Sequence, residues 1–272
     1  SRNIDADACD VDKDGDYDLF VARDSGQNTN KYFENTTQTP DTHAPYIPNV
    51  ESVGNQTASA SPVIMRAQVY DNAPYYITWY NETNADMSVN GHTIPSVSMV
   101  SSGGQIFRAE LPGNLVGSVQ YRVRSDDEYN NTGFSAVESY TGSTGLSIGG
   151  NYGTSTNGSL GAPTLEALSV AFAGTTLYVA GGNTPPGTPI FLALNSASAP
   201  SIPLPGIGIL NVGGSNWATI AASASAAGDF VLPLGLSPTL PSGASLFMQY
   251  FTLDGQGGDL LACSPGLEVV TQ

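Results

Sequence analysis

The chain has 272 residues, of which only 12% are charged, and its net charge is −16 at pH 7. An excess of negative charge this large disfavours binding to nucleic acid or to anionic membrane surfaces, and suits an extracellular protein that binds cations. The sequence contains no run of about 20 apolar residues and therefore predicts no membrane insertion. The length predicts two or three domains, and the 31 glycines and 18 prolines predict turn-rich modules built from strands.

The first distinctive stretch is DVDKDGDYD at residues 10–18, where carboxylates alternate around a glycine. Four of its aspartates stand at positions 1, 3, 5 and 9 of the loop, and a fifth lies between them. Gly15 permits a sharp turn, so several hard oxygen ligands can converge on one cation. The sequence therefore predicts a calcium site with the candidate ligands Asp10, Asp12, Asp14, Asp16 and Asp18.

The loop differs from an EF-hand in its last ligand position and in the element downstream. An EF-hand needs a bidentate Glu at position 12, where this chain has Val21. The residues after Asp18 form the apolar run Leu19–Ala22, which is typical of a buried strand. We expect a calcium loop that leads into a strand, and the alternative is a solvated acidic turn that binds no ion.

The segment DVDKDGDYDLFVARDSGQNTNKYFEN resembles one FG-GAP or VCBS-type repeat, a calcium-binding unit that forms a blade of a β-propeller. Asn30, Phe33 and Asn35 correspond to the second half of that repeat. The match spans about residues 4–36 and implies that residues 1–37 form a blade-like calcium-binding unit. Since a propeller usually has about 4 to 8 blades and the chain has one such loop, the resemblance implies that neighbouring blades or another molecule cover this unit.

A second module comes after a proline-containing linker at residues 36–48. Short runs rich in β-branched and aromatic residues, separated by turn signals, are typical of an immunoglobulin-like or fibronectin-III-like sandwich, which we place at residues 42–141. The phrases RAQVYDN, FRAELP and YRVRSDDEYNNTGFS resemble bacterial Ig-like modules. The predicted strands are Val63–Tyr70, Tyr75–Tyr80, Ile106–Leu111 and Val119–Val123.

Residues 142–159 are rich in Gly, Ser, Thr and Asn and predict a connector, either flexible or irregular but ordered. Residues 160–272 predict a second β-sandwich and weakly resemble C-terminal β-modules of secreted bacterial proteins. Residues 218–227 could form a helix or a strand of small residues, and we favour a strand. The predicted strands of this module are Thr176–Ala180, Ile190–Leu194, Phe230–Leu234, Leu246–Leu253 and Leu267–Val270.

An aromatic cluster at residues 75–80 is the densest in the chain. On a strand, Trp79 would share one face with Tyr75 and fill the core, while Tyr76 and Tyr80 would share the other face. We name Tyr76 and Tyr80 as a candidate surface for a ligand or a partner, with a plain solvated surface as the alternative.

The sequence offers little for catalysis. Its only histidines are His43 and His92, and no nucleotide-binding or hydrolase motif occurs, so we expect no enzyme and no catalytic residue. The run Asp126–Glu128 is interpreted as a solvated turn, with a second cation site as the alternative. Cys9 and Cys263 lie in different modules; they are expected to be free thiols, although a bridge between them or between molecules is possible.

Together these observations predict a secreted or cell-surface, all-β, calcium-binding protein with a structural or adhesive role. Self-association into a filament through the incomplete blade is the expected partner interaction, because uncovered strand edges favour strand addition. The alternative is a polysaccharide-binding or accessory portion of a larger secreted protein or enzyme.

Overall fold

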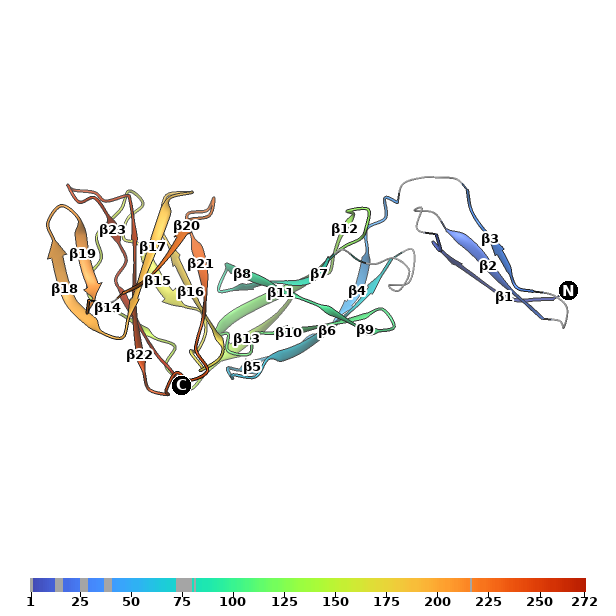
Figure 1. Cartoon of the computed structure of the whole chain (residues 1–272), viewed down its shortest axis with the longest axis horizontal. Coiled ribbons are helices and arrows are strands. Elements are labelled where there is room, and N and C mark those ends of the chain that lie inside the picture. Colours follow the sequence, from blue (N-terminus) through green and yellow to red (C-terminus); the bar gives the residue numbers. More distant parts are fainter. Residues whose placement is uncertain are drawn as a thin grey trace.

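The computed structural model describes residues 2–12, 17–24, 29–36, 41–71, 80, 82–215 and 217–272. Over these ranges the regular structure consists of strands and contains no helix, which confirms the predicted all-β class. Accordingly, this part of the chain holds no helix that could cross a membrane. Figure 1 shows three modules in a row, with the N-terminal sheet at one end and the C-terminal module at the other.

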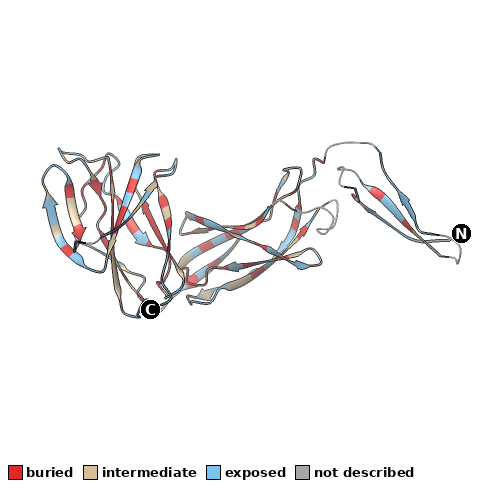
Figure 2. Ribbon diagram, in the orientation of Figure 1, coloured by how far each residue is buried: buried red, intermediate tan, exposed pale blue. Residues whose placement is uncertain are grey.

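The N-terminal module is one antiparallel sheet in the order β1-β2-β3. Its strands are β1 (Arg2–Cys9), β2 (Asp18–Asp24) and β3 (Lys31–Phe33). Side chains alternate between the two faces of a strand, so Leu19 and Phe20 point to opposite sides of β2. Both are about two-fifths exposed, and Phe33 on β3 is more exposed still. Both faces of this sheet therefore carry exposed apolar side chains, although Asp18 and Val21 of β2 are buried. Strand β3 is exposed along its whole length, as Figure 2 shows.

The middle module is a sandwich of two sheets. One sheet has the order β4-β6-β10-β9; the other has the order β5-β13-β11-β7-β8, with β12 paired to β11. Inward residues of both sheets form one apolar core that includes Met65, Val89 and Tyr121. The strands are β4 (Tyr46–Val50), β5 (Gln56–Thr57), β6 (Val63–Tyr70), β7 (Glu82–Val89), β8 (His92–Ser98), β9 (Val100–Gly103), β10 (Ile106–Leu111), β11 (Gly117–Asp126), β12 (Thr132–Phe134) and β13 (Glu138–Ser143).

Strands β6 and β10 coincide with the predicted ranges, whereas the hairpin β7–β8 was not predicted. The sequence of β7, ETNADMSV, has few β-branched residues, but its alternate side chains are buried against the core. Asn90 and Gly91 join the two strands with φ of 51° and 87°, as a tight hairpin turn requires. The predicted strand Tyr75–Tyr80 falls outside the described residues except for Tyr80, which precedes β7 and lies in no strand.

The C-terminal module is also a sandwich. One sheet has the order β14-β24-β22-β17-β20, with β23 paired to β22, and faces the sheet β15-β16-β21; β18 and β19 form a separate hairpin. Its core includes Leu192, Phe230 and Tyr250. The strands are β14 (Gly150–Tyr152), β15 (Thr164–Ala167), β16 (Thr176–Gly182), β17 (Pro189–Asn195), β18 (Ser198–Leu204), β19 (Gly208–Val212), β20 (Ala218–Ser223), β21 (Phe230–Gly235), β22 (Ser245–Thr252), β23 (Ala262–Cys263) and β24 (Gly266–Val270).

The expected connector at residues 142–159 begins with the last two residues of β13 in the middle module and then enters the C-terminal sandwich. Strand β14 lies within it and pairs with β24, so the module begins before residue 160. The run at residues 218–227 begins with strand β20, as favoured from its sequence.

The two sandwiches share a continuous seam. Val116 N–H donates to the carbonyl of Leu168 at 3.0 Å, and Val170 N–H donates to the carbonyl of Asn114 at 2.9 Å. Leu168 and Tyr178 belong to the C-terminal module by sequence, yet they pack in the core of the middle module. Because the two sandwiches share core residues and are joined by backbone hydrogen bonds, they form one packed unit.

Candidate metal centre

Three of the predicted ligands converge where β1 leads into β2. Carboxylate oxygens of Asp10, Asp12 and Asp18 lie within 4.8 Å of one another. Asp10 and Asp18 are 0% and 1% exposed, while Asp12 is exposed. Cys9 and Asp18 face each other across the β1–β2 ladder, and this pairing brings the two ends of the loop together. The other two predicted ligands, Asp14 and Asp16, lie outside the described residues, as does Gly15.

Asp18 is fixed in place by hydrogen bonds to its carboxylate. It accepts from Tyr32 Oη at 2.8 Å, from Asn35 N–H at 2.9 Å and from Val11 N–H at 3.0 Å. Burial by itself would raise the pKa of Asp18, but these hydrogen bonds to the charged form outweigh it and lower the pKa. Burial raises the pKa of the Tyr32 phenol, and its hydrogen bond to Asp18 raises it further. Asp18 is therefore held as a carboxylate in a fixed orientation.

The donor set fits a hard cation. Carboxylate oxygens without nitrogen or sulfur partners are the ligands that calcium takes. Two buried carboxylates this close together repel each other unless a cation or protons compensate. Asp5 and Asp7 are exposed on β1, and their Oδ1 atoms accept from the next residue's N–H. They lie outside the three-residue cluster.

A second carboxylate cluster lies at the edge of the middle module, and sequence reasoning missed it as a group. Asp41 from the linker, Asp71 after β6 and Asp127 after β11 bring carboxylate oxygens within 4.8 Å of one another, and they too could hold a metal ion. Asp41 and Asp127 are buried. Asp127 accepts from the N–H groups of Tyr129 and Asn131, while Asp41 accepts from the N–H of His43.

The run Asp126–Glu128 is divided by this arrangement. Asp126 faces Arg124 and accepts from Thr132 Oγ1 at 2.6 Å, whereas Asp127 turns into the second cluster. Asp41 and Asp71 are far from Asp127 in the sequence, so residue spacing does not predict that the three carboxylates lie together.

The phenol of Tyr17 is affected by charges of both carboxylate clusters. Burial raises its pKa, and the negative charges of Asp71, Asp41 and Asp10 raise it further. Charges of residues from both clusters therefore act on one phenol.

Of the two aromatic site residues, Tyr76 lies outside the described residues. Tyr80 is half-buried: its ring packs edge-on against Phe107 with the centroids 5.5 Å apart, and its hydroxyl donates to the carbonyl of Val69 at 3.4 Å. Burial raises the pKa of this phenol strongly, with the charges of Asp71 and Asp127 adding to the effect. Tyr80 therefore contributes to the packing of the middle module.

Both cysteines are free. Cys9 is partly exposed, and its thiol pKa is raised by burial and by the charges of Asp7, Asp18 and Asp10. Cys263 is fully buried in the C-terminal module. No bridge joins them within the chain.

The sequence matches no known family and no curated protein. The FG-GAP or VCBS resemblance therefore stays a prediction.

Comparison with solved structures gives matches with low TM-scores and little sequence identity. CopC from Methylosinus trichosporium OB3b is 9% identical over 38% of this chain and 98% of that chain, with a TM-score of 0.28. The fibronectin(III)-like modules of Clostridium thermocellum CbhA are 11% identical over 82% and 92%, with a TM-score of 0.24. The D00-D0 domain of intimin is 13% identical over 84% and 98%, with a TM-score of 0.23. TM-scores this low carry no argument, and the sandwich assignment rests on the sheets described above.

Proposed function

We propose that this protein is an extracellular calcium-binding module with a structural or adhesive role, or an accessory portion of a larger secreted protein. The observation that carries the proposal is the convergence of Asp10, Asp12 and Asp18 at the start of β2. Two of these carboxylates are buried, and Asp18 is oriented by three hydrogen bonds. The proposal assigns no reaction to the chain.

In this role Asp10, Asp12 and Asp18 hold calcium together with Asp14 and Asp16 from the loop between them. Calcium supplies the positive charge that allows several carboxylates to stay close. Asp18 also links the site to the sheet, because Tyr32 and Asn35 belong to β3 and the residues after it. Filling the site therefore stabilises the pairing of β2 with β3.

The exposed faces of the N-terminal sheet support self-association as part of the proposal. Leu19, Phe20 and Phe33 leave apolar surface in water, and contact with a second copy or with neighbouring propeller blades would remove it. Because the two sandwiches form one packed unit, such contacts would produce a row of stiff subunits, as a filament requires.

The test combines calcium titration with particle size. Calorimetry on the full chain is expected to show calcium binding with a dissociation constant of about 10⁻⁴ M, typical of extracellular modules. Sedimentation in 1 to 2 mM calcium, a range chosen to be roughly tenfold above that constant, is expected to show assemblies that shrink after addition of a chelator. Absence of calcium binding would refute the proposed function, whereas calcium binding by a monomer would refute only self-association.

A further inference from the structure

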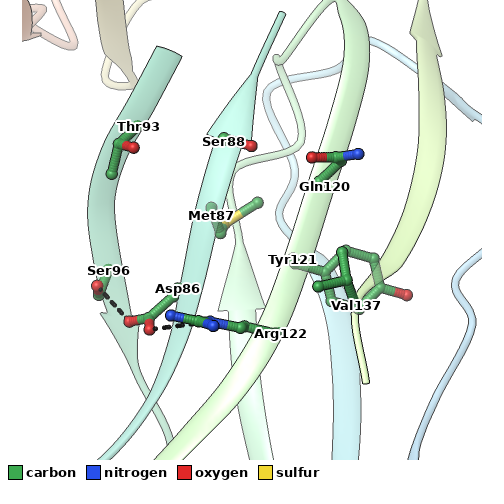
Figure 3. Close-up of a pocket in the computed structure, with 9 residues that line it drawn as sticks. All are labelled: Asp86, Met87, Ser88, Thr93, Ser96, Gln120, Tyr121, Arg122 and Val137. Atoms are coloured by element: carbon green, nitrogen blue, oxygen red, sulfur yellow. Dashed lines mark hydrogen bonds and ion pairs between the residues drawn. The ribbon is translucent and has the colours of Figure 1, made fainter. Parts of the chain in front are cut away.

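The outer face of the β8-β7-β11 sheet carries polar side chains in aligned cross-strand rows. Thr93, Ser88 and Gln120 form one row, because Ser88 pairs with Thr93 on one side and with Gln120 on the other. Asp86 and Arg122 form the next row. Figure 3 shows these side chains on the same side of the three strands.

Two further rows continue this polar strip toward β12. Asn84 pairs with Arg124, which pairs with Phe134 on β12, and Glu82 pairs with Asp126, which pairs with Thr132. Successive rows lie two residues apart, so the four rows extend over roughly 20 Å at about 3.4 Å per residue. The strip is long enough for several units of a polymer.

The strip is hollowed in two places. One hollow of about 430 Å³ is lined by the Ser88 row, by Asp86 and Arg122, and by Val137 at its side. A second hollow of about 510 Å³ is lined by the Glu82 row with Arg124, Asn130 and Phe134. The Phe134 ring is half exposed, and the Arg122 guanidinium stands 4.3 Å from its centroid, so this residue pair separates the hollows.

The two ends of the strip differ in whether their polar side chains are paired within the protein. Arg124 pairs with Glu82 at 3.0 Å and also contacts Asp126. Asp86 lies 3.7 Å from Arg122 and accepts from Ser96 Oγ at 2.8 Å. By contrast, within the described part of the chain, the side chains of Ser88, Thr93 and Gln120 make no hydrogen bond. Two hydroxyls and an amide therefore face the first hollow with their donors and acceptors available.

The charges of the strip determine which ligand suits it. Its two guanidiniums and three carboxylates pair with one another, so the surface offers no excess positive charge to an anionic polymer. A neutral ligand with many hydroxyls can donate to the carboxylates and accept from the guanidiniums and amides without burying a charge of its own. The exposed Phe134 ring adds an apolar surface against which the C–H groups of a sugar ring can pack.

We propose that the polar strip on β8, β7, β11 and β12 binds a neutral polysaccharide, with Gln120 and Arg122 as principal contacts. This inference goes beyond the calcium-dependent role of the N-terminal sheet and does not depend on it.

The test is affinity electrophoresis of the full chain in gels that contain hydroxyethylcellulose, galactomannan or laminarin, with acidic polygalacturonate as the comparison. At least one neutral polymer is expected to retard the protein more than polygalacturonate does. Arg122→Ala is expected to weaken binding about tenfold, as loss of a charge-assisted hydrogen bond would. The matched control is Arg108→Ala on the opposite sheet, since Arg108 and Arg122 side chains are 44% and 45% exposed and each pairs with a carboxylate.

The control variant is expected to change binding by less than about twofold, because Arg108 lies on β10 of the opposite sheet and not on the strip, and loss of a surface ion pair has little effect on stability. Gln120→Ala is a second variant that removes no hydrogen bond of the fold, and it is expected to weaken binding about fivefold. The proposal is overturned if no neutral polymer retards the chain, if polygalacturonate binds best, or if Arg108→Ala weakens binding as much as Arg122→Ala. A change in sedimentation caused by Arg122→Ala without sugar binding would assign the face to a protein contact and also overturn it.

Discussion

Asp18→Asn tests the metal centre most directly, because it removes one charge at a buried position and keeps the shape of the side chain. One oxygen of Asp18 accepts from Asn35 N–H, and the other accepts from Val11 N–H and Tyr32 Oη. The amide of asparagine can replace only one of these oxygens as an acceptor. With about 1.5 to 3 kcal/mol for each hydrogen bond to a charged group, we expect the N-terminal sheet to lose at least about 2 kcal/mol of local stability even without calcium.

The same change should weaken calcium binding more than tenfold, which is about 1.4 kcal/mol. For wild type, a dissociation constant of about 10⁻⁴ M and 1 mM calcium give a linkage stabilisation of about 1.4 kcal/mol. Because neither apolar core contains a residue of the N-terminal sheet, this stabilisation should appear only there. Calcium bound at this site should leave the thermal unfolding of the two sandwiches unchanged.

The assays are calcium calorimetry and hydrogen exchange of the β2 amides, each with calcium and with a chelator. Asp7→Asn is the matched control, since it removes one charge from an exposed residue of the same acidic segment. Equal weakening of calcium binding by both variants would show that diffuse negative charge holds the ion, and would refute the ligand geometry. Residual binding at full strength in Asp18→Asn would instead place the ion in the cluster formed by Asp41, Asp71 and Asp127.

Three further predictions concern the sandwiches. Leu168→Ala opens a cavity in the seam, where the side chain is fully buried in the middle module's core. We expect the free energy of unfolding to fall by about 3 kcal/mol, and calorimetry should show one unfolding transition split into two. Two independent transitions already present in wild type would contradict the shared seam. Burial raises the pKa of Tyr250 to about 12, above about 10 in an unfolded chain. Its contribution to the free energy of unfolding is therefore complete below about pH 10 and is lost as pH rises toward 12. In urea unfolding, Tyr250→Phe should make this free energy fall less steeply with pH, and an unchanged slope would exclude Tyr250 as a cause of the alkaline fall. Tyr80→Ala should lower the stability of the middle module by about 2 kcal/mol, since the Tyr80 ring packs on Phe107. The melting temperature of the control Tyr46→Ala should hardly change, because Tyr46 is 68% exposed. Equal melting temperatures of the two variants would show that the Tyr80 contact adds no stability.

The sequence by itself determined the features that depend on local pattern. Strands β6 and β10 were predicted to the residue, because alternation of side chains and the flanking turns specify a strand without reference to its partners. For the same reason the sequence predicted that the carboxylates of Asp10, Asp12 and Asp18 lie together, since nine consecutive residues contain the whole motif. Strand β7 was missed because its residues have low strand propensity and are held by pairing with β11 and β8.

Only the tertiary structure decided the features that join distant segments. Asp41, Asp71 and Asp127 meet because the linker, the end of β6 and the turn after β11 reach the same edge of one sandwich. The polar strip exists because four strands align their outward residues in register, and register depends on which face is buried. Leu168 packs in the core of the preceding module, and no local sequence pattern predicts this contact. Burial of apolar surface is non-directional, so it stabilises any close packing that the backbone allows.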